Sequence, residues 1–237
     1  MELSYAAMRD DVKKIKKFTD GLTHAAAVAK FTPKMAGMAM KVFVNFIDKR
    51  DNSSAAYGAA QEGSNRALRM LAELNADLNL PATDEVGARP AHISAQYGRT
   101  STIELLVTLR ADIWLGRRGD DSSPLHDACQ NNKPETASLL ISLKANVDRQ
   151  DNEGRTACWE SSFRGHKRMI KLLADAKASV NLANQNGTTP VYMASQEGHP
   201  DAIMALVAAK ASIDQQTHDG ISPIGGAAAS GKDAIGT

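Results

Sequence analysis

The sequence contains few aromatic residues. Phe, Trp and Tyr make up 5% of its 237 residues, although 43% of the chain is hydrophobic. Much of the apolar content is therefore alanine, which suits thin layers of closely packed helices better than one deep core.

Cysteine is also scarce, since Cys129 and Cys158 are the only two and they form no CxxC pair. Both fall in apolar helical patterns, so we interpret them as small core residues in a reducing compartment rather than as a disulfide. No secretory signal opens the chain, because charged residues interrupt its first segment almost at once. The longest apolar run, residues 35–47, contains Lys41 and is too short to span a bilayer. We expect an intracellular protein, cytoplasmic or in the interior of an organelle, and not a secreted one.

Motifs of catalytic and cofactor sites are absent from the sequence. It has no GxSxG, Walker loop, HExxH or GxGxxG. The segment SGKD at 230–233 lacks the upstream glycine and the Ser or Thr after lysine that a phosphate loop needs. Neither His24 nor His218 has Cys, His or carboxylate neighbours at ligand spacing. We therefore expect no catalytic residues, no metal site and no cofactor.

The chain has no strong overall charge, and its net charge of +1 gives no global reason to expect a nucleic acid or an anionic membrane as partner. Residues 1–50 differ, because ten basic and five acidic side chains give them +5 and leave −4 for the rest. The basic cluster around Lys167, Arg168 and Lys171 has no interleaved aromatic residues on which bases could stack. We interpret it as a solvated helix face and expect no nucleic-acid partner.

Repetition is what the sequence has in abundance. Gly154, Gly187 and Gly220 are 33 residues apart, and further copies of the same pattern begin near residues 53, 88 and 122. A period of this length is typical of stacked repeats. In each copy a proline or alanine begins a short helix, a second helix with apolar residues at helical spacing follows, and a polar turn ends in glycine. One helix pair cannot bury both its faces, whereas stacking supplies each pair with a neighbour.

The segments GTTPVYMASQEGH (187–199) and SSPLHDACQNN (122–132) closely resemble the ankyrin repeat, whose consensus is G-x-TPLH-x-A-x-x-G-H ending in A-D/N-V-N. The resemblance covers residues 51–237, as five full units and the start of a sixth. It implies an all-α, ankyrin-type solenoid of stacked helix-turn-helix repeats with short β-hairpin or turn fingers. The implied ankyrin repeat domain is therefore 51–237.

The resemblance also implies roles for the repeated histidines. His92 and His126 occupy the TPLH column, where the ring hydrogen-bonds adjoining loops, and His166 and His199 occupy the GH column. Because these placements recur from copy to copy, we interpret all four as structural. Trp159 and Tyr192 share the first of these columns, and there we expect them to pack.

We expect residues 1–50 to form an N-terminal helical capping region that contains degenerate repeats. Residues 3–21 fit a capping unit, and residues 22–50 fit another helix pair broken at Thr32–Pro33. We interpret Met35, Met38 and Met40 as core filling. The alternative is a docking surface for a partner helix or a membrane, and membrane contact is expected only through 32–48. The last segment has no polar terminal unit, so we expect that the chain continues or that another protein covers this edge.

The fingers and the exposed face of the first helices form the surface that the ankyrin family commonly uses to bind proteins. Aromatic, Arg and Met side chains are frequent interface anchors. The predicted partner-binding residues are Tyr97, Arg117, Arg118, Glu160, Phe163, Arg164, Met193, Gln196 and Glu197. Trp114, beside a longer loop, either fills that loop or presents a contact.

The leading hypothesis is a non-catalytic protein–protein interaction module, an adaptor that binds a protein partner through its concave surface. The alternative is a peripheral structural subunit of a large multiprotein complex, with or without a membrane. An enzyme would need a catalytic domain beyond Thr237. The identity of the partner does not follow from the residues, because the scaffold tolerates wide variation outside its core columns.

Overall fold

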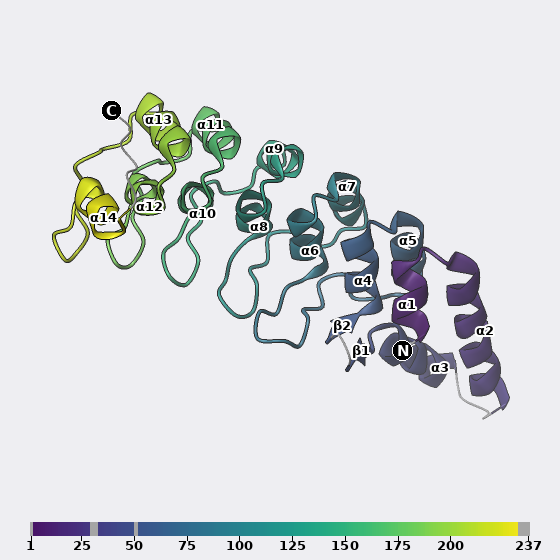
Figure 1. Ribbon diagram of the computed structural model, residues 1–237. Helices are drawn as coiled ribbons and strands as arrows, with labels where there is room; N and C mark the ends of the chain where they lie inside the picture. The colour runs from purple at the N-terminus through teal and green to yellow at the C-terminus, as the bar shows by residue number, and fades with distance from the viewer. Residues whose placement is uncertain (1, 29–32, 50–51, 232–237) are drawn as a thin grey trace. The chain divides into compact units, whose positions relative to one another are not determined.

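The computed structural model comprises two compact units, residues 1–119 and 120–237, and it describes residues 2–28, 33–49 and 52–231 (Figure 1). The elements of the first unit are α1 (Glu2–Met8), α2 (Val12–Val28), α3 (Pro33–Val44), β1 (Ile47–Asp48), β2 (Ser53–Ser54), α4 (Ala55–Glu62), α5 (Asn65–Glu73), α6 (Pro90–Gln96) and α7 (Thr100–Thr108). The elements of the second unit are α8 (Pro124–Gln130), α9 (Pro134–Ser142), α10 (Ala157–Phe163), α11 (Lys167–Asp175), α12 (Pro190–Gln196), α13 (Pro200–Ala208) and α14 (Pro223–Ala229).

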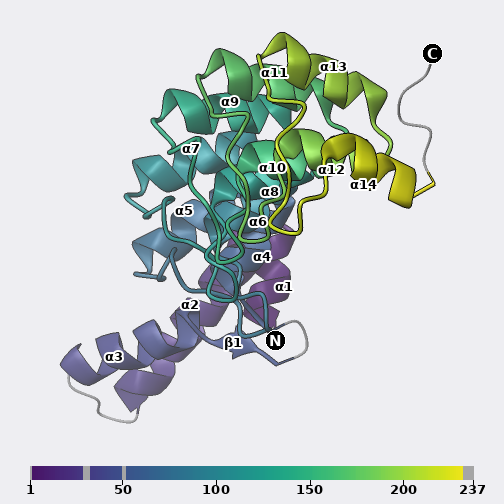
Figure 2. The same ribbon diagram turned by 90° about the vertical axis from the view of Figure 1, so that its left-hand side faces the viewer.

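The second unit is a stack of helix pairs in which a short first helix is followed by a longer second helix. The first helices α8, α10, α12 and α14 pack on one another in chain order. The second helices α9, α11 and α13 form a neighbouring row, and the loops between pairs project as fingers on the side away from that row (Figures 1 and 2). The predicted helix-turn-helix repeats are confirmed here.

The first unit contains the same kind of pair. Helix α4 packs against α5 and α6, and α5 packs against α7. The two short strands pair in antiparallel fashion, with Ile47 opposite Ser54 and Asp48 opposite Ser53. The sheet is therefore a minor feature of a helical unit.

Side-chain caps explain where the first helices of the second unit begin. Thr156 Oγ1 accepts a hydrogen bond from the Trp159 amide at 3.1 Å, and Thr189 Oγ1 accepts one from the Tyr192 amide at 3.2 Å. Each bond satisfies an amide of the first turn that has no partner within the helix. Pro190, at the first position of α12, has a backbone φ that already suits a helix and no amide to satisfy.

The core of the second unit is a column of leucines contributed by the second helices. Leu140, Leu173 and Leu206, each 33 residues from the next, have 0% exposure. Burying a leucine side chain contributes about 1.5–3 kcal/mol. The repeat period thus places one such contribution in every helix pair.

One prediction for the N-terminal region is wrong. We expected a boundary after Gly21, between a capping unit and a separate helix pair, but α2 continues through Gly21 to Val28. Instead, α1 and α2 pack together, α1 covers α4, and the longer α2 reaches both α5 and α3. The helix survives at Gly21 because a single exposed glycine costs only about 1 kcal/mol relative to alanine. The start of α3 at Pro33 agrees with the predicted break, although Thr32 lies outside the described residues.

The interpretation of the methionines as core filling is wrong for Met38, which is 62% exposed. Met40 is half-buried, and the side chain of Met35 lies outside the described residues. Helix α3 contacts the rest of the unit mainly through α2, which leaves Met38 and Val42 exposed. Among the described residues, none of the helices combines the length and the apolarity needed to cross a bilayer.

Candidate protein-interaction surface

A buried histidine, His126, connects α8 to the finger that precedes α10. In α8 the Ser123 amide donates to His126 Nδ1 at 3.1 Å, and the Ser123 hydroxyl lies 2.8 Å from the same nitrogen. Because Nδ1 accepts, Nε2 carries the proton and donates to the carbonyl of Arg155 at 3.1 Å. The predicted role of this histidine in holding an adjoining loop is confirmed.

A second column of histidines fixes the C-terminal ends of the first helices. His166 Nε2 donates to the Gln130 carbonyl, and His199 Nε2 donates to the Phe163 carbonyl, each at 3.1 Å. Burial lowers the pKa of His166, and the charges of Arg164 and His199 lower it further against the opposing effect of the Gln130 bond. The structural interpretation of both rings is confirmed.

Two stacked aromatic rings of α10 are flanked by two arginine side chains from the residues just outside the helix. Phe163 stacks on Trp159 with ring centroids 5.7 Å apart and an interplanar angle of 17°. The Arg155 guanidinium lies 5.9 Å from the Trp159 ring, and that of Arg164 lies 5.2 Å from the Phe163 ring. Trp159 and Phe163 are four residues apart and therefore share one face of α10.

The pair of stacked rings is anchored at its buried end. Trp159 is 8% exposed, and its Nε1 donates to Thr188 Oγ1 of the next finger at 3.1 Å. Tyr192 is equally buried in the same cluster, so the packing role predicted for these two side chains is confirmed. Phe163 packs against that cluster while remaining half-buried, and Arg164 is exposed.

A small ionic cluster holds Arg155. Its guanidinium contacts Asp151 at 2.8 Å, Glu153 at 3.4 Å and Glu160 at 3.5 Å. Burial opposes the charge on Arg155, but the hydrogen bond to Asp151 and the charges of the three carboxylates outweigh it and raise the pKa of Arg155. Arg155 was not among the predicted site residues, although its spacing of four from Trp159 was a usable signal.

The structure corrects two predicted contact residues. Glu160 is 6% exposed and Met193 is 7% exposed, so neither presents the outward surface that we expected. Met193 belongs to the cluster with Trp159 and Tyr192, and Glu160 is covered by Arg155. Both lie on the sides of first helices that face a neighbouring first helix, and the stacking of helices therefore buries them.

The remaining predicted residues of the second unit stay accessible. We define the recognition surface as Phe163, Arg164, Gln196 and Glu197, which lie at the C-terminal ends of α10 and α12. All but Arg164 are half-buried, so they form a supported surface rather than a mobile one. The structure places these four side chains on adjacent, directly packed helices.

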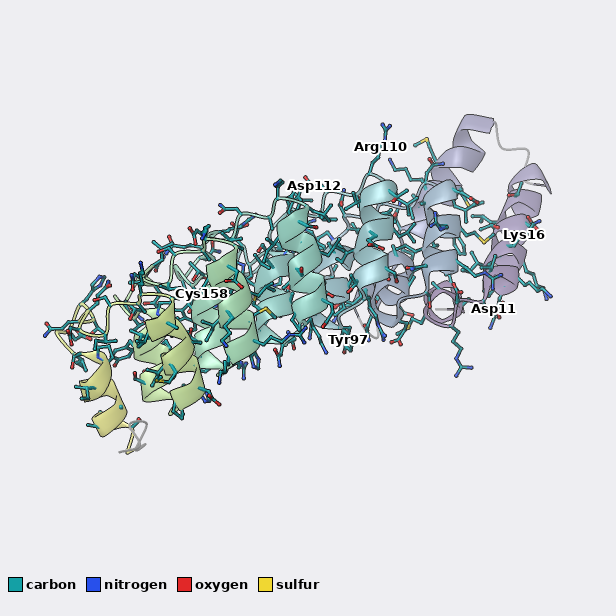
Figure 3. All side chains as sticks on the ribbon, turned by 90° about the horizontal axis from the view of Figure 1, so that it is seen from above. Asp11, Lys16, Tyr97, Arg110, Asp112 and Cys158 are labelled. Carbon is teal, nitrogen blue, oxygen red and sulfur yellow. The ribbon has the colours of Figure 1, made fainter. Side chains whose placement is uncertain are left out.

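In the first unit, Tyr97 is 46% exposed at the end of α6, on the side of the helices opposite Arg110 in Figure 3. Arg118 is exposed, but its side chain donates to the Asp84 carbonyl at 2.9 Å and its amide bonds the Gly87 carbonyl, so it braces a finger. Arg117 is half-buried. Trp114 is 40% exposed, which leaves part of its ring accessible.

Reactive groups in the described part of the chain are few and buried. Cys129 and Cys158 are buried free thiols, as predicted. Burial raises the pKa of both, to about 12 for Cys158 despite a hydrogen bond with Ser162. No group of three or more His, Cys, Asp or Glu side chains among the described residues is arranged to hold a metal ion.

The family description "Ankyrin repeats (3 copies)" matches residues 91–184, 125–219 and 161–235. These matches span more than half of the chain, which therefore belongs to the ankyrin repeat family. Repeats of this family generally serve as protein–protein interaction modules, and the fold is typically non-catalytic.

Three similar proteins agree with this assignment. Inversin from Canis lupus familiaris is 32% identical over 105 residues, which is 44% of this chain and 9% of inversin. The ankyrin repeat domain of Bcl-3 superposes with a TM-score of 0.74 at 17% identity, covering 95% of this chain and 93% of that domain. An ankyrin repeat domain from Acinetobacter baumannii has a TM-score of 0.66 at 25% identity, covering 89% of this chain and 98% of that domain. The predicted all-α ankyrin fold is confirmed, while the chain spans about a tenth of the length of the inversins that it matches.

Proposed function

We propose that this chain is a non-catalytic adaptor that binds a protein partner inside the cell through the first-helix side of its repeats. The observation that carries the proposal is the pairing of half-buried Phe163 with exposed Arg164 beside a buried aromatic cluster. Membership of the ankyrin repeat family supports protein binding as the function, and the recognition surface supports the first helices as the place where the partner binds.

The recognition surface has the composition of an interface centre. Aromatic and Arg side chains dominate the binding energy of many protein interfaces. Phe163 is held from below by Trp159, and its backbone carbonyl is fixed by His199. Little side-chain freedom remains to be lost when a partner binds, which lowers the entropic cost of association.

The partner surface is expected to combine an apolar patch with hydrogen-bond acceptors. Arg164 presents its charge over the Phe163 ring and is itself exposed. Gln196 and Glu197 add polar groups at the end of the neighbouring helix. This arrangement favours a folded or helical protein partner with a carboxylate placed opposite Arg164.

The test is a comparison of proteins retained from an extract of the source cells. The full chain, the double variant Phe163→Ala/Arg164→Ala and the control Arg168→Ala are immobilised at equal density. Arg168 is a suitable control because it is an exposed arginine on a second helix, paired with Glu135 at 3.0 Å. We expect a stoichiometric protein to be retained by the wild type and the control and lost from the double variant, with thermal stability within about 1 kcal/mol of wild type for all three.

Retention of the same proteins by all three forms would refute the placement of the binding surface. Native size in a gentle extract is the complementary measurement. Migration near the chain's own mass of 25.3 kDa indicates an adaptor with transient partners, whereas one large stoichiometric particle indicates a structural subunit.

A second candidate, the peripheral subunit of a large assembly, is favoured by helix α3 and the residues after it. Met38, Val42 and Phe46 are 62%, 72% and 54% exposed. Met38 and Val42 share one face of α3, and Phe46 follows two residues after the helix ends. Replacing all three with Gln is expected to release the chain from such a particle while leaving the recognition surface intact. Sedimentation of the wild-type chain with anionic lipid vesicles, lost in this variant, would assign these three side chains to a membrane surface instead.

A further inference from the structure

A groove runs between the second helices α11 and α13, on a different side of the second unit from the recognition surface. These two helices pack directly against each other and lie side by side in Figures 1 and 2. The groove has a volume of about 650 Å³. Five of its ten lining residues are alanines, among them Ala174 and Ala178 on one side and Ala205 and Ala208 on the other. Because no long side chain fills the space between the helices, the backbone ridges remain separated by an open channel.

The rim of the groove is positively charged. Lys171, Lys177 and Lys210 line it together with a single carboxylate, Asp175, which leaves a net charge of +2. No ion pair joins any of these lysines to a carboxylate among the residues that the structure describes.

Neighbouring charges on the same helices are neutralised. Lys167 pairs with Asp201 at 2.6 Å and Arg168 pairs with Glu135 at 3.0 Å. Both pairs bridge adjacent second helices near the N-terminal ends of those helices. Lys177 and Lys210 therefore carry most of the unpaired positive charge, toward the C-terminal ends of α11 and α13, while Lys171 also helps to lower the pKa of Asp201.

Two of the rim lysines occupy strained backbone positions. Lys177 and Lys210 follow the ends of α11 and α13 with φ of 68° and 66°, a left-handed conformation that glycine adopts at much lower cost. The same conformation occurs at Lys144, one repeat earlier, so it belongs to the helix end of each repeat rather than to the groove. Glycine should therefore be well tolerated at Lys177 and Lys210.

We propose that this groove binds a short, extended, acidic segment of a protein partner. In an extended chain alternate side chains point to the same side, about 7 Å apart. Aspartate or glutamate at every second position would present a row of carboxylates to the three lysines, and small residues between them suit a lining rich in alanine. An anionic peptide is favoured over a nucleic acid, because no aromatic side chain lines the groove to stack a base.

The chain offers a variant that removes charge without weakening the fold. Replacing Lys177 and Lys210 with glycine deletes two ammonium groups and relieves both left-handed backbones, so a loss of binding cannot be ascribed to unfolding. Lys144→Gly is the matched control, since Lys144 follows α9 with φ of 72° and is exposed but does not line the groove.

The probe is a fluorescein-labelled peptide of about a dozen alternating Asp and Ala residues, followed by fluorescence anisotropy with the full chain. We expect saturable binding that weakens at least about tenfold in Lys177→Gly/Lys210→Gly and less than about twofold in Lys144→Gly. Binding should also weaken as ionic strength rises from about 0.05 M to about 0.3 M. Ala208→Phe, which places a ring in the groove, is expected to abolish binding while all charges remain.

Three results would overturn the proposal. The first is equal weakening by the double variant and by Lys144→Gly, which would indicate nonspecific attraction to the whole positive surface. The second is unimpaired binding to Ala208→Phe, and the third is tighter binding of a single-stranded oligonucleotide than of the peptide. The variant Phe163→Ala/Arg164→Ala should retain peptide binding. A negative result for the groove therefore leaves the recognition surface untouched, and a negative result for the recognition surface leaves the groove untouched.

Discussion

Replacing Gly187 with alanine tests whether adjacent fingers pack by direct backbone contact. Gly187 has φ of 75°, and a Cβ added to it would lie 2.6 Å from the backbone nitrogen of His218 and 2.7 Å from His218 Cδ2. The backbone nitrogen cannot move independently, because the His218 amide donates to the Asn186 carbonyl at 3.2 Å. Gly220, one repeat later, has the same φ of 75° but meets only Gln216 Oε1, at 3.9 Å. Comparing Gly187→Ala with Gly220→Ala therefore separates the free-energy cost of the left-handed backbone from the cost of the steric clash.

The magnitudes follow from these two terms. A left-handed backbone costs an L-residue about 1–2 kcal/mol. Loss of glycine's freedom in the unfolded chain returns about 0.4–1 kcal/mol. Gly220→Ala is therefore expected to destabilise the second unit by about 1 kcal/mol. The clash at Gly187 adds about 1–3 kcal/mol, for a total of about 2–4 kcal/mol.

Urea unfolding of the full chain, followed by far-UV circular dichroism, measures both variants. Stacked repeats can lose cooperativity, so the same transition must be compared in each variant. In thermal scans each kcal/mol corresponds to about 2–4 °C, which separates the two variants clearly. Equal destabilisation by Gly187→Ala and Gly220→Ala would refute the reasoning, because it would show that the fingers have room for a side chain.

Three further predictions concern the core, the thiols and pH. Leu173→Ala, at a position of 0% exposure, should destabilise the second unit by about 2–5 kcal/mol in urea unfolding. A loss of stability below about 1 kcal/mol would mean that neighbouring side chains move in to fill the cavity. Cys129 and Cys158 should resist a thiol reagent in the folded chain and react fully in urea, because burial raises the pKa of both thiols. Rapid labelling of either cysteine without urea would contradict their burial. The folded-state pKa of His166 lies below its unfolded value, so the unfolded chain binds more protons and stability should fall as pH drops through about 6.5. His166→Gln should flatten that dependence in urea midpoints between pH of about 7.5 and about 5.5, and an unchanged slope would count against the assignment.

Much of the fold could be predicted from sequence because its determinants are local and repeated. The spacing of 33 residues between Gly154, Gly187 and Gly220 marks successive copies of one helix pair. A helix cap such as Thr156 depends on residues within one turn, so it is encoded in adjacent positions. The histidine columns recur with the same spacing, and His126, His166 and His199 make the backbone contacts expected of a structural role.

The candidate site could be predicted only in part. Sequence reasoning placed Phe163, Arg164, Gln196 and Glu197 on one side of the first helices, and the structure leaves all four accessible to some degree. It also placed Glu160 and Met193 there, and both are buried. Whether these side chains bind a partner stays a prediction.

The sequence by itself determined the repeat, the helix pairs and the column of buried leucines, because these depend on periodicity and on interactions within a few residues. Tertiary structure decided which polar and apolar side chains face a neighbour: it buries Met193 against Trp159 and leaves Met38 exposed. It also decided that the alanines of α11 and α13 border an open groove rather than a filled seam. Whether a side chain is buried depends on how close the neighbouring helices lie. Adjacent residues in the sequence do not set that distance, so burial is seen only in the packed stack.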